Sequence, residues 1–223
     1  MTTDDRPSRP ESSPPESTGF PWGLQYRHRR EVSARYPSVF SIPIERRPRD
    51  VLLRNVDDGM RVLDVGAGPR RAGDRIQAVK NGVEYRTLDP DPGSDHDYRR
   101  MEDVEGKFDR VLLFELLEHL SPEDSARLLE ELRECIVPGG RLIVTTPNVF
   151  HPTSWFRDMT HRTPIAYDEL GGLLERCGYR LVELVRIHNA PWLAKVARRV
   201  LLTPLHRSLG VDYARSVMAI AAV

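Results

Sequence analysis

The segment VLDVGAG, running from Val62 to Gly68, decides the fold class of this chain. It begins as a short run of β-forming apolar residues, carries the acid Asp64 within that run, and ends in the glycines Gly66 and Gly68. Glycine at both positions lets the backbone turn sharply and approach a ligand, because no Cβ stands in the way. A strand that ends in such a loop and leads into a helix is typical of open α/β sheets, which bind nucleotide-like ligands at the carboxyl ends of their strands.

Residues after the second glycine exclude two phosphate-binding loops. A dinucleotide fingerprint needs a third glycine three residues after Gly68, and this chain has Arg71 there. A P-loop needs Gly-Lys followed by Ser or Thr, and no such run follows Gly68. The loop therefore lacks the features that would bind a pyrophosphate.

A second acid, Asp89, follows at the tip of the next predicted strand. This strand is expected over 84–88, after a helix over 71–80 that Asn81 and Gly82 end. A carboxylate at such a tip can accept hydrogen bonds from both hydroxyls of a ribose. Two acids at neighbouring strand tips suit a nucleoside that carries positive charge.

From residue 50 onward, short β-rich runs alternate with amphipathic helical stretches, which indicates a parallel sheet flanked by helices. Together with 61–65 and 84–88, further strands would complete a seven-stranded sheet. They are expected near Tyr98 and over 108–114, 141–146, 179–187 and 214–223, with helices over 46–55, 121–136 and 168–177.

The chain divides into three regions by composition. Residues 1–19 are rich in Pro and Ser and are expected to form a disordered tail. Residues 20–49 alternate aromatic side chains with arginines and prolines and are expected to form a lid segment. The catalytic domain is expected over 50–223 and includes an amphipathic basic insertion at 190–209, before the last strand. This insertion could pack against the core or a second subunit, or could make a peripheral membrane contact.

Composition and charge set the class of partner. With 223 residues, of which 39% are hydrophobic and 30% charged, the chain suits one domain with a tail, as a monomer or homodimer. Lys plus Arg equals Asp plus Glu at 33 each, so the charge disfavours nucleic acid as a partner. No apolar run is long enough for a membrane span and the N-terminus is polar, so a cytoplasmic protein is expected.

Four phrases now stand in order along the chain: VLDVGAG, TLDPD, FDRVLLFELLEHL and PGGRLIVTTPN. Over about residues 45–187 they resemble the class I S-adenosylmethionine-dependent methyltransferases, in the type 11/23-like subgroup whose fourth strand ends in an LEHL phrase. The resemblance implies an α/β, Rossmann-like fold with a seven-stranded, mostly parallel sheet flanked by helices. It also implies S-adenosyl-L-methionine as the cofactor.

The resemblance assigns cofactor-binding roles by position. It implies that Gly66, Ala67 and Gly68 wrap the methionine end of the cofactor and that Asp64 organises this loop. The resemblance also implies that Asp89 binds the ribose and that Asp103 contacts the adenine amino group. Val104 would contact the adenine through its backbone, and Glu115 would lie at the cofactor pocket.

Candidates for the acceptor end follow the fourth strand. Methyl transfer is an in-line displacement, for which an enzyme supplies alignment and, for a hydroxyl acceptor, a base. Glu115, Glu118 and His119 stand at i, i+3 and i+4, so one helical turn would place them on a common side. His161 lies in the loop after the fifth strand and can reach the same mouth, and further candidates are Asp158 and His151.

Two interpretations of this cluster stay open. In the first, Glu115 and His119 orient and deprotonate a hydroxyl with help from His161, and no metal takes part. The expected activity is then methylation, at oxygen, of a small molecule or a glycan acceptor. In the second, these residues and Glu118 bind a divalent ion, an arrangement that resembles the metal-dependent small-RNA 2'-O-methyltransferases. A non-catalytic cofactor-binding or regulatory domain is the alternative from another class.

Overall fold

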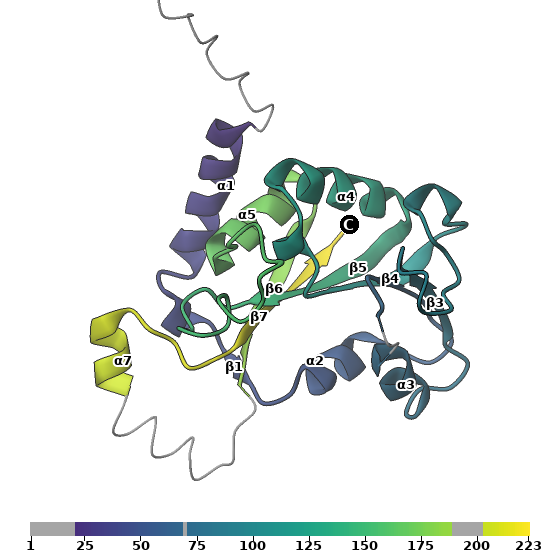
Figure 1. The fold of residues 1–223 in the computed structure, drawn as a ribbon, viewed down its shortest axis with the longest axis horizontal. Helices are drawn as coiled ribbons and strands as arrows, with labels where there is room; N and C mark the ends of the chain where they lie inside the picture. Colours follow the sequence, from purple (N-terminus) through teal and green to yellow (C-terminus); the bar gives the residue numbers. More distant parts are fainter. Residues whose placement is uncertain (1–20, 69–70, 189–202) are drawn as a thin grey trace, which may run out of the picture.

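The computed structural model describes residues 21–68, 71–188 and 203–223 (Figure 1). The predictions for residues 1–19 and for 190–202 of the basic insertion lie outside these ranges. One seven-stranded sheet forms the centre, with the order β1-β6-β7-β5-β4-β2-β3. The strands are β1 (Ile44–Glu45), β2 (Arg61–Val65), β3 (Glu84–Leu88), β4 (Phe108–Phe114), β5 (Ile136–Pro147), β6 (Arg180–Ile187) and β7 (Ser216–Ala222).

The sheet is parallel except for β7, which runs antiparallel to both of its neighbours, β5 and β6. The pairs β1–β6, β2–β3, β2–β4 and β4–β5 are all parallel. The predicted seven-stranded, mostly parallel sheet is therefore confirmed. Because parallel strands end at the same edge, the residues that follow β2, β3, β4 and β5 are brought together there.

One member of the sheet differs from the prediction. The segment at Tyr98 forms a single bridge to Leu88 rather than a strand, and the seventh strand is β1 at the opposite edge. The reason lies in Asp97, whose carboxylate accepts hydrogen bonds from the Thr87 backbone N–H (2.9 Å) and hydroxyl (2.8 Å). The Asp97 side chain therefore occupies the Thr87 backbone N–H, which would otherwise form a ladder hydrogen bond with a further strand.

Helices cover both faces of the sheet (Figure 1). The helices α4 and α5 cover one face, with α1 lying beside α5, and α2 and α3 cover the other. Their bounds are α1 (Trp22–Arg35), α2 (Pro48–Asn55), α3 (Arg71–Gln77), α4 (Pro122–Glu134), α5 (Tyr167–Arg176) and α7 (Thr203–Leu209). Three short 3-10 helices are η1 (Val39–Ser41), η2 (Met101–Asp103) and η3 (Leu117–His119).

The start of α4 follows directly from its sequence. The Ser121 hydroxyl accepts the Asp124 backbone N–H at 3.1 Å, and Pro122 occupies the first turn, where its missing N–H costs nothing. Leu129 and Leu132 are fully buried against the sheet. The Ser125 hydroxyl in the first turn of α4 donates to the Leu117 carbonyl at 3.4 Å and so connects the helix to the preceding η3 turn.

The segment 20–49 packs mainly against α5. Arg29 of α1 donates to Asp168 at 2.9 Å and to Glu169 at 2.7 Å. Gly172 allows this approach, because a Cβ there would lie 2.7 Å from the Arg29 backbone nitrogen. Among the described residues 21–49, Pro48 and Arg49 line the cavity described below. Its role as a lid stays a prediction.

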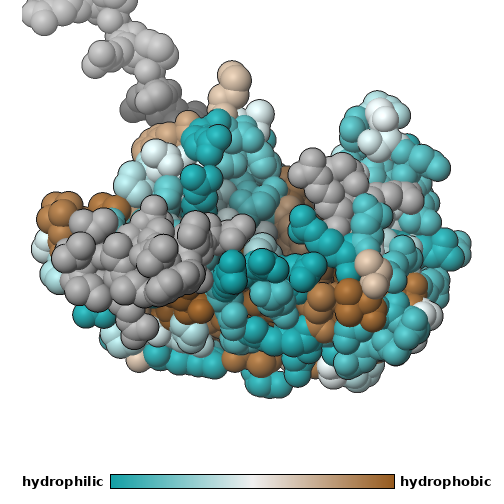
Figure 2. All heavy atoms as spheres, turned by 90° about the horizontal axis from the view of Figure 1, so that it is seen from below, coloured by the Kyte–Doolittle hydropathy of each residue, from teal (hydrophilic) through white to brown (hydrophobic). Residues whose placement is uncertain are grey.

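The surface gives no large apolar face in the view of Figure 2. Hydrophilic residues cover most of this face, and the hydrophobic residues lie in small separate groups. Within the described ranges, no helix has the length and apolar character that crossing a membrane requires. A peripheral membrane contact stays a prediction.

Candidate active site

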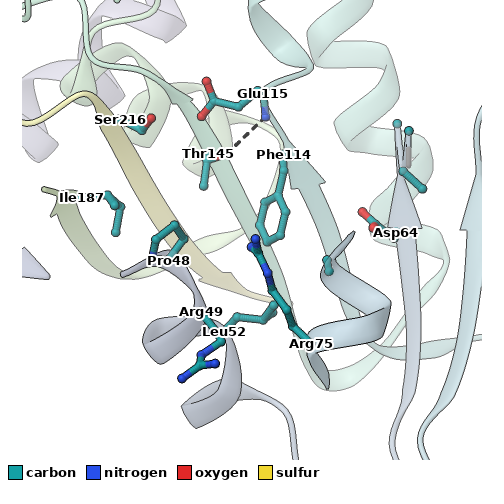
Figure 3. Close-up of a pocket in the computed structure, with 14 residues that line it drawn as sticks. Pro48, Arg49, Leu52, Asp64, Arg75, Phe114, Glu115, Thr145, Ile187 and Ser216 are labelled. Atoms are coloured by element: carbon teal, nitrogen blue, oxygen red, sulfur yellow. Dashed lines mark hydrogen bonds between the residues drawn. The ribbon is translucent and has the colours of Figure 1, made fainter. Parts of the chain in front are cut away.

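A cavity of about 570 Å³ opens where β2, β4 and β5 end (Figure 3). Its walls include five of the residues predicted to bind the cofactor: Asp64, Gly66, Ala67, Gly68 and Glu115. Figure 3 shows Asp64 on one side of the cavity and Glu115 with Ser216 on another, with Phe114 between them. A cavity of this volume is large enough for a small-molecule ligand.

The glycine loop has the backbone that the sequence predicts. Gly66 and Gly68 both adopt positive φ angles, +69° and +47°, in the left-handed region that favours glycine. A Cβ on Gly66 would lie 3.2 Å from the Leu116 side chain, whereas a Cβ on Gly68 would meet nothing within 4 Å. The space beside Gly68 therefore leaves the loop backbone open to a ligand.

Asp64 lies beneath this loop, and 3% of its surface is exposed. Burial is the main reason that the pKa of the Asp64 carboxyl is raised to about 7, and the charge of Asp89 adds to this shift. A hydrogen bond from the Tyr85 hydroxyl acts in the opposite direction and lowers the pKa. An unpaired buried carboxylate is costly unless a cation lies near it. Asp64 is therefore suited to a positively charged ligand in the cavity.

Asp89 contacts the loop rather than the cavity wall. Its two carboxylate oxygens accept the backbone N–H groups of Gly68 and Asp91, each at 2.9 Å. An ionised carboxylate has about four lone-pair sites, so two hydroxyls can bind without displacing these amides. Asp89 thus combines a fixed position with free acceptor capacity.

The structure does not bring Asp103 and Val104 to this cavity. Asp103 ends the η2 turn, is exposed, and pairs with Arg100 at 2.9 Å, which lowers the pKa of the Asp103 carboxyl. Val104 packs against the core as a partly buried residue. Their contact with adenine stays a prediction.

Glu115 follows β4 with an unusual backbone. Its φ of +50° lies in the left-handed region. Among the described residues, Glu115 is the one non-glycine residue with a positive φ. Its backbone N–H donates to the carbonyl of Thr145 at 3.0 Å and to the Thr145 hydroxyl at 3.2 Å. Such conformations cost roughly 1–3 kcal/mol and cluster at functional sites.

The backbone at Glu115 corrects one expectation from the sequence. The spacing predicted one helical turn that carries Glu115, Glu118 and His119 on a common side. Instead, β4 ends at Phe114, Glu115 is left-handed, and only Leu117–His119 form a turn, of 3-10 type. Glu115 therefore faces the cofactor cavity, while Glu118 and His119 form a separate group.

A second cavity of about 320 Å³ adjoins the first. Glu115 and Ser216 line both cavities, and His161 lines the second. Burial raises the pKa of the Glu115 carboxyl, and the hydroxyls of Thr145 and Ser216 oppose this shift. A donor in the first cavity and an acceptor in the second would therefore meet beside Glu115 and Ser216.

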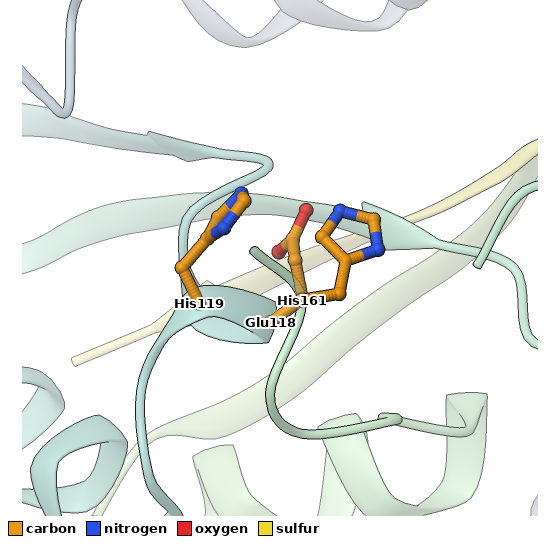
Figure 4. A group of neighbouring side chains, drawn as sticks. All are labelled: Glu118, His119 and His161. Atoms are coloured by element: carbon orange, nitrogen blue, oxygen red, sulfur yellow. The ribbon is translucent and has the colours of Figure 1, made fainter. Parts of the chain in front are cut away.

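Glu118, His119 and His161 converge (Figure 4). One ligating atom from each lies within 4.8 Å of the others, and the two imidazoles stand on either side of the Glu118 carboxylate. Glu118 has no exposed surface, and among the described residues neither of its carboxylate oxygens has a hydrogen-bond partner. Burial and the charges of Glu115 and Asp158 raise the pKa of Glu118 to about 8.

Hydrogen bonds fix the tautomers of both histidines. His161 Nδ1 lies 2.9 Å from the Trp155 carbonyl oxygen, which only accepts, so Nδ1 carries the proton and Nε2 keeps its lone pair. His119 Nδ1 lies 2.9 Å from the Thr160 hydroxyl, which itself donates to Asp158 at 2.6 Å. His119 Nδ1 therefore also donates, and both Nε2 atoms are available.

Sequence reasoning missed several residues of the two cavities. Asp158 lines the second cavity as proposed, whereas His151 lines neither and lies near Thr153. The missed residues are Thr145, Arg157, Arg215 and Ser216. The TTPN phrase placed Thr145 at a strand end, but nothing in the sequence showed that β7 begins beside it.

The parallel sheet, the glycine loop and the acids at adjacent strand ends define a class I methyltransferase that uses S-adenosyl-L-methionine. The chain belongs to the methyltransferase-domain family, whose model matches residues 40–184. The residues present suit this cofactor, because the loop is open at Gly68 and no cationic side chain among the described residues pairs with buried Asp64. None of the curated proteins compared with this chain matches it.

Solved structures share the fold. A SAM-dependent methyltransferase from Archaeoglobus fulgidus is 18% identical with a TM-score of 0.62, and the match covers 91% of this chain and 99% of that one. The cyclopropane synthase MmaA2 from Mycobacterium tuberculosis is 14% identical (TM-score 0.55; 78% and 82% covered). The N-methyltransferase NodS from Bradyrhizobium japonicum is 13% identical (TM-score 0.51; 78% and 93% covered). Because the activities of these proteins differ, the fold alone does not fix the methyl acceptor.

Cofactor affinity is expected to depend on pH through Asp64. A cationic ligand favours the ionised carboxylate, and with a pKa of about 7 only a minor fraction is ionised at pH 6. The Kd for S-adenosyl-L-methionine should therefore fall by about tenfold from pH 6 to pH 8, in proportion to that fraction. Calorimetric titrations at both pH values measure this change. Asp64→Asn should remove most of it, and an undiminished change in that variant would contradict the role of Asp64.

Proposed function

We propose that this enzyme methylates an oxygen atom of a small molecule or saccharide. The bound cofactor supplies a methyl group on a positively charged sulfur. The observation that supports oxygen as the acceptor atom is His161, which lines the acceptor cavity together with Glu115 and whose Nδ1 is held by the Trp155 carbonyl, so that Nε2 is the nitrogen that can accept a proton. A hydroxyl needs such a base, because it is a weak nucleophile while it keeps its proton.

His161 removes the proton in this proposal. An acceptor hydroxyl in the second cavity donates to His161 Nε2, and its oxygen is aimed at the boundary marked by Glu115 and Ser216. As the new carbon–oxygen bond forms and the carbon–sulfur bond of the cofactor breaks to leave S-adenosylhomocysteine, the hydroxyl proton would move to Nε2. The Trp155 carbonyl holds the ring in orientation and stabilises the charged imidazolium. Glu115 accepts hydrogen bonds from the acceptor and fixes its position.

The proposal changes the emphasis of the sequence prediction. There, His119 was the expected base and His161 assisted. His119 lines neither cavity, and its ring meets the His161 ring edge-on with centroids 4.9 Å apart. We therefore assign His119 to positioning His161.

A second candidate is a metal-dependent methyltransferase. Three potential ligands within 4.8 Å, with the unpartnered carboxylate of Glu118 between two histidines, favour a divalent ion. Each histidine also donates its other nitrogen to an oxygen, as metal-bound histidines do. In this candidate His161 is a ligand and does not act as the base.

Transfer of labelled methyl into fractionated host extract tests the function. We expect label in small molecules or glycolipids, at equal yield with and without a chelator. Label in RNA that a chelator abolishes would instead support the metal-dependent candidate. Label in neither fraction, from protein that binds the cofactor, would contradict both.

Glu118→Gln separates the two candidates. With a pKa of about 8, Glu118 is mostly neutral at pH 7, so glutamine reproduces its size and charge. In the metal-free proposal, labelling by this variant stays within about threefold of wild type, well inside the spread of side-chain substitutions. A metal site would lose an anionic ligand, and activity would fall far more.

A further inference from the structure

Two arginines, Arg157 and Arg215, line the acceptor cavity. Arg157 comes from the loop after β5, and Arg215 directly precedes β7. Within the described part of the chain, neither guanidinium makes a hydrogen bond or an ion pair. Two distant segments of sequence thus bring two free cations to the wall of one cavity of about 320 Å³.

Nearby acids are already engaged. Asp212, three residues before Arg215, binds the buried Arg186 at 2.8 Å through one oxygen and Asn148 at 2.8 Å through the other. Asp158 lines the cavity but accepts both the backbone N–H and the hydroxyl of Thr160 through Oδ1. Among the described residues, these two acids therefore leave both guanidinium groups without a partner.

The cavity wall carries two guanidinium groups, from Arg157 and Arg215, and arginine keeps its charge in proteins. Two acids line the same cavity: hydrogen bonds from Thr160 lower the pKa of Asp158, and burial raises the pKa of Glu115. Like charges that share a cavity repel each other, and an anionic ligand between them removes that repulsion.

The remaining polar groups complement an anion. Thr153, Ser154 and Ser216 add hydroxyl groups to the same wall, and each hydroxyl can donate a hydrogen bond. Guanidinium groups bind the paired oxygens of carboxylates, phosphates and sulfates through two parallel hydrogen bonds. Hydroxyl donors supply the further contacts that such oxygens require.

We propose that the methyl acceptor carries an oxyanion group, which Arg157 and Arg215 bind in the second cavity while the reacting hydroxyl faces Glu115 and His161. This inference rests on the proposed function, since it names the substrate class of the same site. A phosphate, a sulfate and a carboxylate share the chemistry that the two arginines recognise. The acceptor would thus be an acidic or phosphorylated small molecule or saccharide.

A titration with inorganic phosphate tests the anion site. The protein is first saturated with S-adenosylhomocysteine, which covers the cofactor cavity, and ¹H–¹⁵N NMR then follows added phosphate. We expect saturable binding that weakens at least tenfold in the double variant Arg157→Gln, Arg215→Gln. Arg180→Gln is the matched control, because Arg180 is exposed at the amino end of β6, away from the strand ends that form the site. Parallel titrations with sulfate and acetate identify the preferred oxyanion.

The outcomes separate this inference from the proposed function. Saturable binding that depends on the two arginines supports an anionic acceptor. Absence of saturable binding by all three anions, or equal affinity in wild type and the double variant, overturns it. If S-adenosylhomocysteine binds normally in that case, the proposed function stands without it. If S-adenosylhomocysteine itself fails to bind, the proposed function fails instead.

Discussion

Replacing His161 by alanine is expected to lower kcat for methyl transfer about 100-fold or more, which is the usual contribution of a general base. The reason is geometric: His161 is the histidine that lines the acceptor cavity, and the Trp155 carbonyl fixes its free Nε2. The Kd for S-adenosyl-L-methionine should stay within about twofold, since His161 does not line the cofactor cavity. Labelled methyl transfer and calorimetry measure the two quantities.

His119→Ala is the matched control for this prediction. The two histidines are neighbours, but His119 reaches the acceptor only through His161. We expect a loss of about tenfold for His119→Ala, because a positioning residue contributes less than the base itself. A larger loss of kcat in His119→Ala than in His161→Ala would show that His119 is the base. Equal and complete losses that added metal partly restores would support the metal-dependent candidate.

Replacing Asp89 by alanine is expected to raise the Kd for S-adenosyl-L-methionine by well over tenfold. Hydrogen bonds to a charged group contribute about 1.5–3 kcal/mol, and Asp89 has acceptor sites left for a ribose. The substitution also frees the Gly68 backbone N–H that Asp89 now binds at 2.9 Å, which loosens the glycine loop. Both effects weaken cofactor binding without removing core packing.

Asp91→Ala is the matched control, because Asp91 is an exposed acid of the same segment whose carboxylate accepts the Gly93 backbone N–H and no other donor among the described residues. We expect its Kd to stay within about twofold of wild type, as for most exposed substitutions. Thermal unfolding shows that both variants are folded. Wild-type affinity in Asp89→Ala would contradict the ribose assignment.

The sequence was most informative where one local rule determines the structure. The VLDVGAG loop predicted a sharp turn at Gly66 and Gly68, which both adopt positive φ angles, and the Ser121–Pro122 start predicted α4. Glycine and cap signals act within a few residues, so they can be interpreted without knowing the fold. The strand pattern also predicted that Asp89 directly follows β3.

Interpretation of the acceptor end was limited by a local exception and by long-range contacts. The spacing of Glu115 and His119 indicated a helical turn, but the left-handed backbone at Glu115 separates the two side chains. Its strain is held by hydrogen bonds to Thr145 on the neighbouring strand, which no local pattern contains. Arg157 and Arg215 likewise meet only because β7 runs antiparallel beside β5.

The most direct test of the central claim is a calorimetric titration of the wild-type protein with S-adenosyl-L-methionine at pH 8. The account predicts saturable binding at one site per chain, with S-adenosylhomocysteine competing for that site. Absence of saturable binding by both ligands, from protein shown to be folded, would contradict the assignment of the cavity beside Gly68 as a cofactor site.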